Sequence, residues 1–112
     1  MTADEARRLA LSLPEATEQN HHGRPSFRVS GKIFATLWDE RHMNVMLDQA
    51  GIVTAVQDHA WCAERWWGKQ LAAVSVELER ADPAALAELV ADAWEGKAPK
   101  RLAWAARDEG RA

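Results

Sequence analysis

The residues of this 112-residue chain that most readily do chemistry are four histidines and one cysteine. His59 and Cys62 have the spacing of two zinc ligands, but a zinc site needs three or four, and no second cysteine or paired histidine stands at a conventional spacing. The adjacent His21 and His22 point to opposite sides of an extended segment, so they cannot readily share a metal. Cys62 as a nucleophile needs a base within hydrogen-bond reach, which a nearby histidine in a loop does not guarantee. We therefore predict no metal site, no cofactor and no catalytic residue.

Two stretches rich in Lys and Arg offer contacts for phosphate groups. Arg24, Arg28 and Lys32 fall in a stretch without acids, and a second basic stretch runs from Lys97 to Arg107. If both stretches met on one face, phosphates could bind there, helped by the free N–H groups of a helix that begins at Pro99. The residues predicted to contact DNA are Arg24, Arg28, Lys32, Lys69, Lys100 and Arg101.

The overall charge weighs against DNA as the partner. Fourteen Lys and Arg stand against seventeen Asp and Glu, so the formal net charge is −3, whereas dedicated nucleic-acid binders are usually basic. The alternative is a solvated surface on which these cations pair with nearby acids. Any DNA binding is therefore expected to be weak, sequence-tolerant and salt-dependent.

Tryptophan usage favours a different kind of partner. The chain has six Trp, two Phe and no Tyr, and one core of this size rarely needs so many indoles, because each buried indole N–H requires a partner. Trp38, Trp61, Trp66 and Trp67 lie near the predicted sheet, where their rings could wall a cleft for a planar aromatic molecule. The alternative is that they are core and rim residues, as Trp94 is on the apolar stripe of a helix.

The elements that would position these residues make up one α+β domain. A capping box from Thr2 to Glu5 begins a first helix, and Asp82 with Pro83 begins the clearest helix, for which Gly96 is the predicted end. Further expected elements are strands within 17–22, 26–30, 33–38, 43–47 and 72–78, short helices after Asp48 and Pro99, and a loop over 58–68. Sequential antiparallel strands with helices on one face predict a sandwich whose sheet has about five strands.

The longest predicted helix is expected to pack on this sheet through an apolar stripe. The stripe consists of Leu86, Leu89, Val90 and Trp94, and the sheet face under it consists of Ile33, Ala35, Leu37, Val74 and Val76.

Length and composition set the remaining bounds. One domain over residues 1–107 is expected, with a frayed tail at 108–112. The N-terminus has acids where a secretory signal needs a positive charge, the lone cysteine forms no internal disulfide, and no stretch approaches the ~20 apolar residues of a membrane span. These features predict a cytoplasmic protein without membrane partners, and they leave its oligomeric state open, a monomer included.

Three segments carry a resemblance to the MmcQ/YjbR family, over residues 5–105. They are His22 to Leu37, Trp67-Gly68-Lys69 with the strand that follows, and Ala93-Trp94 with residues 98–103. The resemblance implies a frataxin-like fold, an antiparallel sheet backed by helices, and the family commonly carries a DNA-binding label. It supplies no catalytic or base-reading residues that could be transferred to this chain.

The resemblance also bears on the paired indoles of residues 66 and 67. Successive side chains on an extended backbone point to opposite sides, and the family match implies that Trp67 is the structural one, which leaves Trp66 with Trp61 beside a ligand. Near these residues, at Leu71-Ala72-Ala73, the chain is one residue longer than the family pattern, so this loop is expected to be reshaped. Together the patterns predict a non-enzymatic binding protein, with DNA as the first candidate partner and a planar aromatic small molecule as the alternative.

Overall fold

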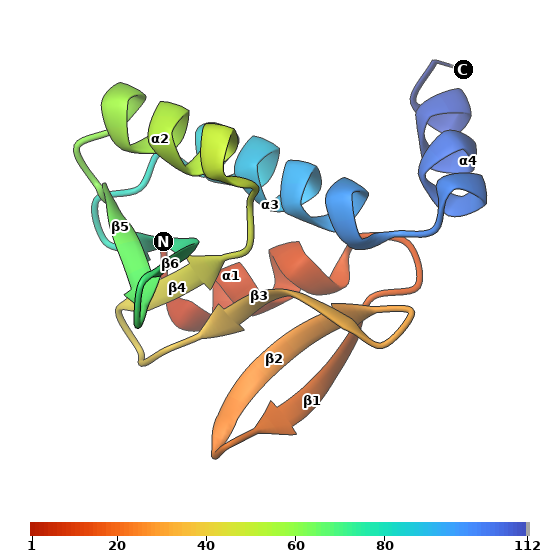
Figure 1. The fold of residues 1–112 in the computed structure, drawn as a ribbon. Coiled ribbons are helices and arrows are strands. Elements are labelled where there is room, and N and C mark those ends of the chain that lie inside the picture. Colours follow the sequence, from red (N-terminus) through yellow and green to blue (C-terminus); the bar gives the residue numbers. More distant parts are fainter. Residues whose placement is uncertain (112) are drawn as a thin grey trace.

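An antiparallel sheet with helices packed against it forms the fold (Figure 1). The computed structural model describes the backbone of residues 1–111 and the side chains of residues 1–105. Within that range the strands are β1 (Thr17–His21), β2 (Arg24–Val29), β3 (Lys32–Leu37), β4 (His42–Val45), β5 (Cys62–Trp67) and β6 (Gln70–Glu77), and the helices are α1 (Ala3–Leu11), α2 (Gln49–Asp58), α3 (Pro83–Lys97) and α4 (Lys100–Arg111). The strand order is β1–β2–β3–β4–β6–β5. The predicted α+β class is confirmed, with six strands where about five were expected.

Capping interactions fix where the helices begin. The Oγ1 of Thr2 accepts the N–H of Glu5, while the Glu5 carboxylate accepts the N–H of Thr2, which completes the predicted capping box. At the start of α3 the Asp82 carboxylate accepts the N–H of Ala85 at 2.9 Å, and Pro83 occupies the first turn. Because these contacts span only three residues, the sequence alone locates them.

The end of α3 differs from the prediction. The helix passes Gly96, continues to Lys97 and is capped by Ala98, whose backbone is extended. The physical reason is Pro99, since a proline holds the residue before it out of the helical region.

The predicted loop over 58–68 is wrong in its second half. Residues Cys62–Trp67 form strand β5, which pairs with β6 through a hairpin that turns at Gly68, where φ is 61°. As an edge strand, β5 fully buries only Cys62. Its other side chains are exposed, apart from the half-buried Arg65, so the alternation that predicts a strand is missing.

A β-bulge in β3 decides which side chains face the helices. Phe27 pairs with Ala35, whereas Arg28, the next residue of β2, pairs with Ile33, so Phe34 is the extra residue. Phe34 and Ala35 are both buried in the core, while Ile33 lies half-buried on the other face. The predicted position of Ile33 under α3 is therefore wrong, because one extra residue inverts the alternation.

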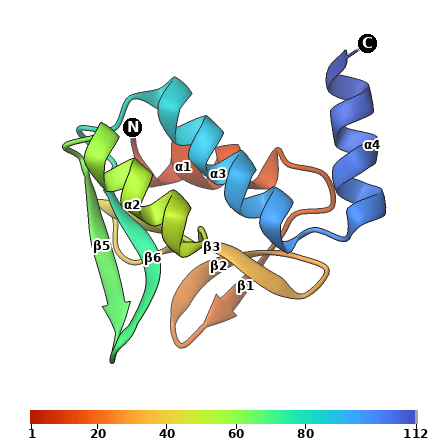
Figure 2. The ribbon, with the colours of Figure 1, turned by 45° about the horizontal axis from the view of Figure 1, so that its top comes forward.

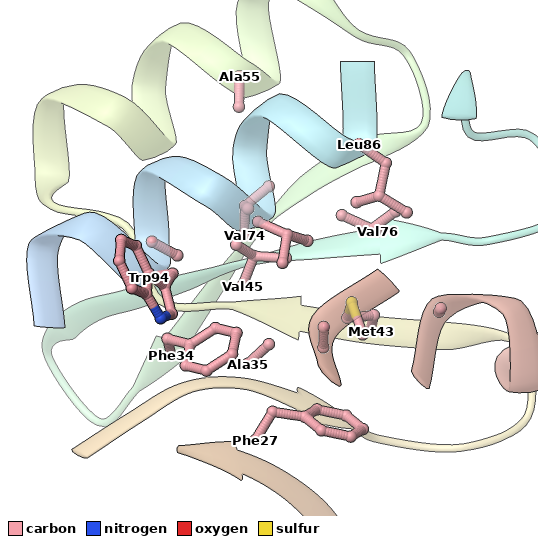
Figure 3. Packing of buried hydrophobic residues seen from close by; sticks show 14 of the residues in the cluster. Phe27, Phe34, Ala35, Met43, Val45, Ala55, Val74, Val76, Leu86 and Trp94 are labelled. Atoms are coloured by element: carbon pink, nitrogen blue, oxygen red, sulfur yellow. The ribbon is translucent and has the colours of Figure 1, made fainter. Parts of the chain in front are cut away.

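The apolar stripe of α3 packs on the helix-facing side of the sheet, as predicted (Figure 3). Figure 3 shows the Trp94 ring over Phe34 and the Leu86 side chain over Val76. The indole Nε1–H of Trp94 donates to the carbonyl of Pro14 at 3.0 Å. This bond ties α3 to the chain that leaves α1, so the same ring both fills the core and links two elements.

Two further predictions from the sequence are the absence of a membrane-spanning segment and a frayed C-terminal tail. None of the helices within the described residues is long and apolar enough to cross a membrane. The predicted frayed tail at 108–112 falls on residues whose side chains lie outside the described range.

Candidate ligand-binding cleft

A cleft of about 560 Å³ lies on the sheet face opposite the core. It is lined by His21, His22, Arg24, Ile33, Thr36, Trp38, Asn44, Met46, Trp67, Gln70, Ala72 and Lys97. The β1–β2 and β5–β6 hairpins extend away from the helices in both ribbon views (Figures 1 and 2). A twisted sheet bends two opposite corners toward the same face, which brings both hairpins to one cleft. The volume falls within the range of small-molecule sites, ~300–1,000 Å³.

Trp38 forms one wall and is held by two arginines. The Cζ atoms of Arg24 and Arg65 lie 3.8 and 4.2 Å from the centroid of the Trp38 ring. The Nε–H of Arg24 also donates to the Trp38 carbonyl at 2.9 Å. Stacked guanidinium groups are attracted to the ring face, so the indole is fixed in orientation before any ligand arrives.

The β3–β4 turn fixes the backbone of this wall. The N–H of Trp38 donates to the carbonyl of His42 at 3.0 Å, and the Asp39 carboxylate accepts the N–H groups of Arg41 and His42 at 2.7 and 2.8 Å. The bond from the Arg41 N–H is the main cause that lowers the pKa of Asp39. The turn therefore keeps the Asp39 carboxylate ionised, and its hydrogen bonds hold the backbone that follows Trp38 in place.

Trp67 also lines the cleft, from the β5–β6 hairpin. Its side chain is 53% exposed and lines the cleft, whereas the neighbouring Trp66 is 51% exposed and donates its Nε1–H to the Glu64 carboxylate at 2.8 Å. The expectation that Trp67 is core and Trp66 borders the ligand is therefore wrong. Both rings stand at the end of an edge hairpin, beyond the part of the sheet that α2 and α3 cover, so neither face buries an indole there.

Trp61 does not belong to this cleft either. It is buried in the core, just before β5, and its ring stacks on the imidazole of His59 with 4.4 Å between centroids. The prediction that Trp61 borders a ligand is wrong, because the residue lies on the side of the sheet that faces the helices. Of the four predicted indoles, the structure brings Trp38 and Trp67 together.

The floor carries two polar side chains that are almost fully buried. Thr36 and Asn44 pair across β3 and β4 and are 9% and 2% exposed. No hydrogen bond joins either side chain to a residue with a described side chain. Among the described side chains, Arg65 Nε is the only polar atom that is both inaccessible to solvent and without a hydrogen bond. The polar atoms of Thr36 and Asn44, which also lack a bond, are therefore still accessible, and both residues line the cleft. Buried polar groups are normally paired, so these two remain available to a molecule in the cleft.

The cleft carries charge of one sign. Arg24 lies at the β1–β2 hairpin and Lys97 at the end of α3, while no Asp or Glu is among the described residues that line it. The whole chain nonetheless has a net charge of −3. Acids are thus placed elsewhere, and a cleft lined by a single sign concentrates the local field.

The six residues predicted to contact DNA are spread over the molecule. Arg24 and Arg28 lie on β2, Lys32 at the β2–β3 turn, Lys69 at the β5–β6 turn, and Lys100 and Arg101 at the start of α4. Arg28 is half-buried, and its Nε–H donates to the Ser26 Oγ at 3.2 Å. In both ribbon views α4 rises on the side opposite the two hairpins (Figures 1 and 2). Only Arg24 of the six lines the cleft.

The candidate nucleophile Cys62 is a core thiol. Burial raises its pKa to about 11, so it is protonated at neutral pH and weakly nucleophilic. The imidazole of His59 is engaged in its stack on Trp61. Within the described side chains, no group of three His, Cys, Asp or Glu residues is placed to hold a metal.

A second hollow, of about 740 Å³, lies between α2 and α3, but its chemistry is less suited to an organic ligand. Asp48, Asp58, Glu88 and Asp92 line it, and no Trp or Phe is among its described lining residues. The carboxylate of Asp48 already caps α2 through the N–H of Gly51. We therefore assign the candidate site to the first cleft.

The sequence reasoning missed the floor of the cleft. Asn44 stands between the apolar residues Met43 and Val45, and a polar residue inside such a strand is the signal that could have found it. Thr36 lies two residues before Trp38 and therefore on the same face of the strand, which is a weaker indication that it belongs to the site. No sequence pattern indicates Met46, Gln70 or Ala72, because the pairing of β4 with β6 is what brings them to the site.

Comparison with known protein families places the chain. A family model described as YjbR matches residues 11–96, which span all six strands and most of α3. No curated protein and no solved structure matches the chain. The frataxin-like fold implied by the resemblance therefore stays a prediction.

Proposed function

The chain belongs to the YjbR family, and from that premise we propose that it is a non-enzymatic binding protein that holds a planar aromatic small molecule in the cleft between its two hairpins. One observation carries this proposal. The indoles of Trp38, which two arginines hold, and of Trp67, which is half-exposed, line a cleft. The floor of this cleft presents the unpaired polar groups of Thr36 and Asn44. Mostly apolar walls with a few placed polar groups are the usual composition of a small-molecule site.

The energetics of such a complex favour a flat ligand. A ring that enters between the walls contacts the indole of Trp67 and gains apolar burial together with an aromatic contribution of ~0.5–1.5 kcal/mol per pair. Because Arg24 and Arg65 already hold Trp38, little side-chain freedom is lost on that side when the ligand binds.

The test is a titration of the chain with planar aromatic compounds of one to three fused rings, followed by tryptophan fluorescence and calorimetry. Trp67→Ala should weaken binding by ~1–3 kcal/mol, the range of stacking on an aromatic side chain. Trp66→Ala is the matched control, since it removes the same ring at similar exposure from the same hairpin but outside the cleft. Equal affinities of the two variants, or no binding by the unmodified chain, would reject the proposal.

Weak, sequence-tolerant DNA binding is a second candidate, and one observation favours it. No ion pair engages Arg24, Arg28, Lys32, Lys69 or Lys100 within the described side chains. Cations without acidic partners remain available to phosphate groups. Their spread over the molecule favours a diffuse contact with the DNA backbone over readout of bases.

A further inference from the structure

The two cations of the cleft are placed to meet a negative charge inside it. The Nε–H of Arg24 is used by the Trp38 carbonyl at 2.9 Å, which leaves its terminal N–H groups without an acidic partner among the described side chains. Lys97 likewise forms no ion pair within that range. Both are half-buried, so a neutral ligand that covers them would remove water from two charges and give nothing in return.

The geometry of Arg24 suits a carboxylate better than a single point of charge. Its guanidinium lies over the Trp38 ring, 3.8 Å from the centroid, and is held there by the bond through Nε. A guanidinium fixed in this way presents its remaining donors as a planar pair, which matches the two oxygens of an acid group. A ring that carries an acid could therefore stack in the cleft while its acid group meets Arg24.

From this arrangement we infer that the cleft selects a planar aromatic anion, with its acid group on Arg24, Lys97 adding to the favourable field, and Asn44 with Thr36 bonding a polar atom of the ligand. This inference rests on the proposed function and adds the charge of the ligand to it. The absence of Asp and Glu among the described lining residues sets the sign, since an aromatic cation would meet only like charge here.

The experiment compares two probes of the same shape, 2-naphthoate and the uncharged 2-naphthamide, by calorimetry at neutral pH and low salt. The acid should bind about tenfold more tightly, the ratio expected for one charge-assisted bond. Arg24→Gln should bring the ratio of acid to amide affinity to about one, and this ratio within the variant is the readout because Arg24 also holds the Trp38 wall. Arg24→Lys should keep part of the preference, and Arg41→Gln, which removes an exposed cation outside the cleft, should keep all of it.

The outcomes separate this inference from the proposed function. Equal affinities for acid and amide in the unmodified chain would overturn the inference while aromatic binding stands. A preference for the acid that survives Arg24→Gln would overturn the role given to Arg24. If neither naphthalene compound binds, the proposed function fails together with the inference.

Discussion

Three polar residues form a row across β2, β3 and β4, and they differ in whether the protein itself satisfies them. Ser26 pairs with Thr36, which pairs in turn with Asn44. The hydroxyl of Ser26 donates to the carbonyl of Gln19 at 2.8 Å. Thr36 and Asn44 have no such bond to any side chain or backbone group in the described part of the chain, although both are buried. Because these polar groups are buried without a partner, they do not stabilise the fold, and under the proposed function they would pair with the ligand.

Substitutions at Ser26 and Thr36 should differ in their effect on the free energy of unfolding. Ser26→Ala removes a satisfied hydroxyl and should lower the free energy of unfolding by about 1 kcal/mol. Thr36→Val replaces an unpaired hydroxyl by a methyl group of the same shape and should leave that free energy unchanged or raise it by up to ~1 kcal/mol. Urea denaturation of both variants measures the difference. A loss in Thr36→Val as large as that in Ser26→Ala would show that the Thr36 hydroxyl has a structural role.

At the scale of elements, helix α3 packs on one face of the sheet and the two hairpins line the cleft on the other face. The helix buries Leu86, Val90 and Trp94 against one face of the sheet, and the hairpins β1–β2 and β5–β6 build the cleft on the other. Because the core residues and the cleft residues alternate along β3, the strand serves both faces at once. Its bulge at Phe34 adds a second large side chain to the core and leaves Ile33 to the cleft.

The stripe of α3 gives a direct test of this division. Trp94→Ala should lower the free energy of unfolding by ~3–5 kcal/mol, as truncation of a large buried aromatic does, with loss of the bond to the Pro14 carbonyl included. The matched control is Trp104→Ala on α4, where the indole is 67% exposed and the change should stay within ~0.5 kcal/mol. Similar denaturation midpoints for the two variants would contradict the packing of α3.

At the scale of the whole molecule, the sign of the charge is separated in space. The chain is acidic overall, and its acids include those that line the hollow between α2 and α3, while the described residues that line the cleft are cationic or neutral. A long polyanion such as DNA meets this entire field, whereas a small anion meets mainly the cleft. This difference makes salt the variable that distinguishes the two candidate partners.

Any DNA binding should therefore be weak and should fall steeply with salt. The logarithm of the affinity should decrease with the logarithm of salt concentration by about 0.9 per phosphate contacted, and Arg28→Glu with Lys100→Glu should reduce it further at every salt concentration. Fluorescence anisotropy of a labelled duplex measures both effects, and a scrambled duplex of equal length should bind equally well. Affinity that is constant across salt, or undiminished in the double variant, would exclude this electrostatic mode.

Local sequence patterns are sufficient to predict the α+β class, the starts of α1 and α3 and the buried stripe of α3. The reason is that capping and helical periodicity depend on residues three or four apart. The residue types at Thr2, Glu5, Asp82 and Pro83 are therefore enough to locate the two helix starts. It also identified Trp38, Trp67 and Arg24 as candidate site residues by type.

How these candidates combine depends on contacts between distant parts of the chain. The pairing of β5 with β6, the bulge that turns Ile33 outward, and the placement of Arg24 and Trp67 at one cleft depend on hydrogen bonds between strands that are distant in the chain. Residue types leave such pairings open, because a one-residue change of register moves every later side chain to the opposite face. For the same reason Trp61 and Trp66 share the chemistry of Trp67 but not its position, and Asn44 lines the cleft because β4 pairs with β3 and β6 in the middle of the sheet.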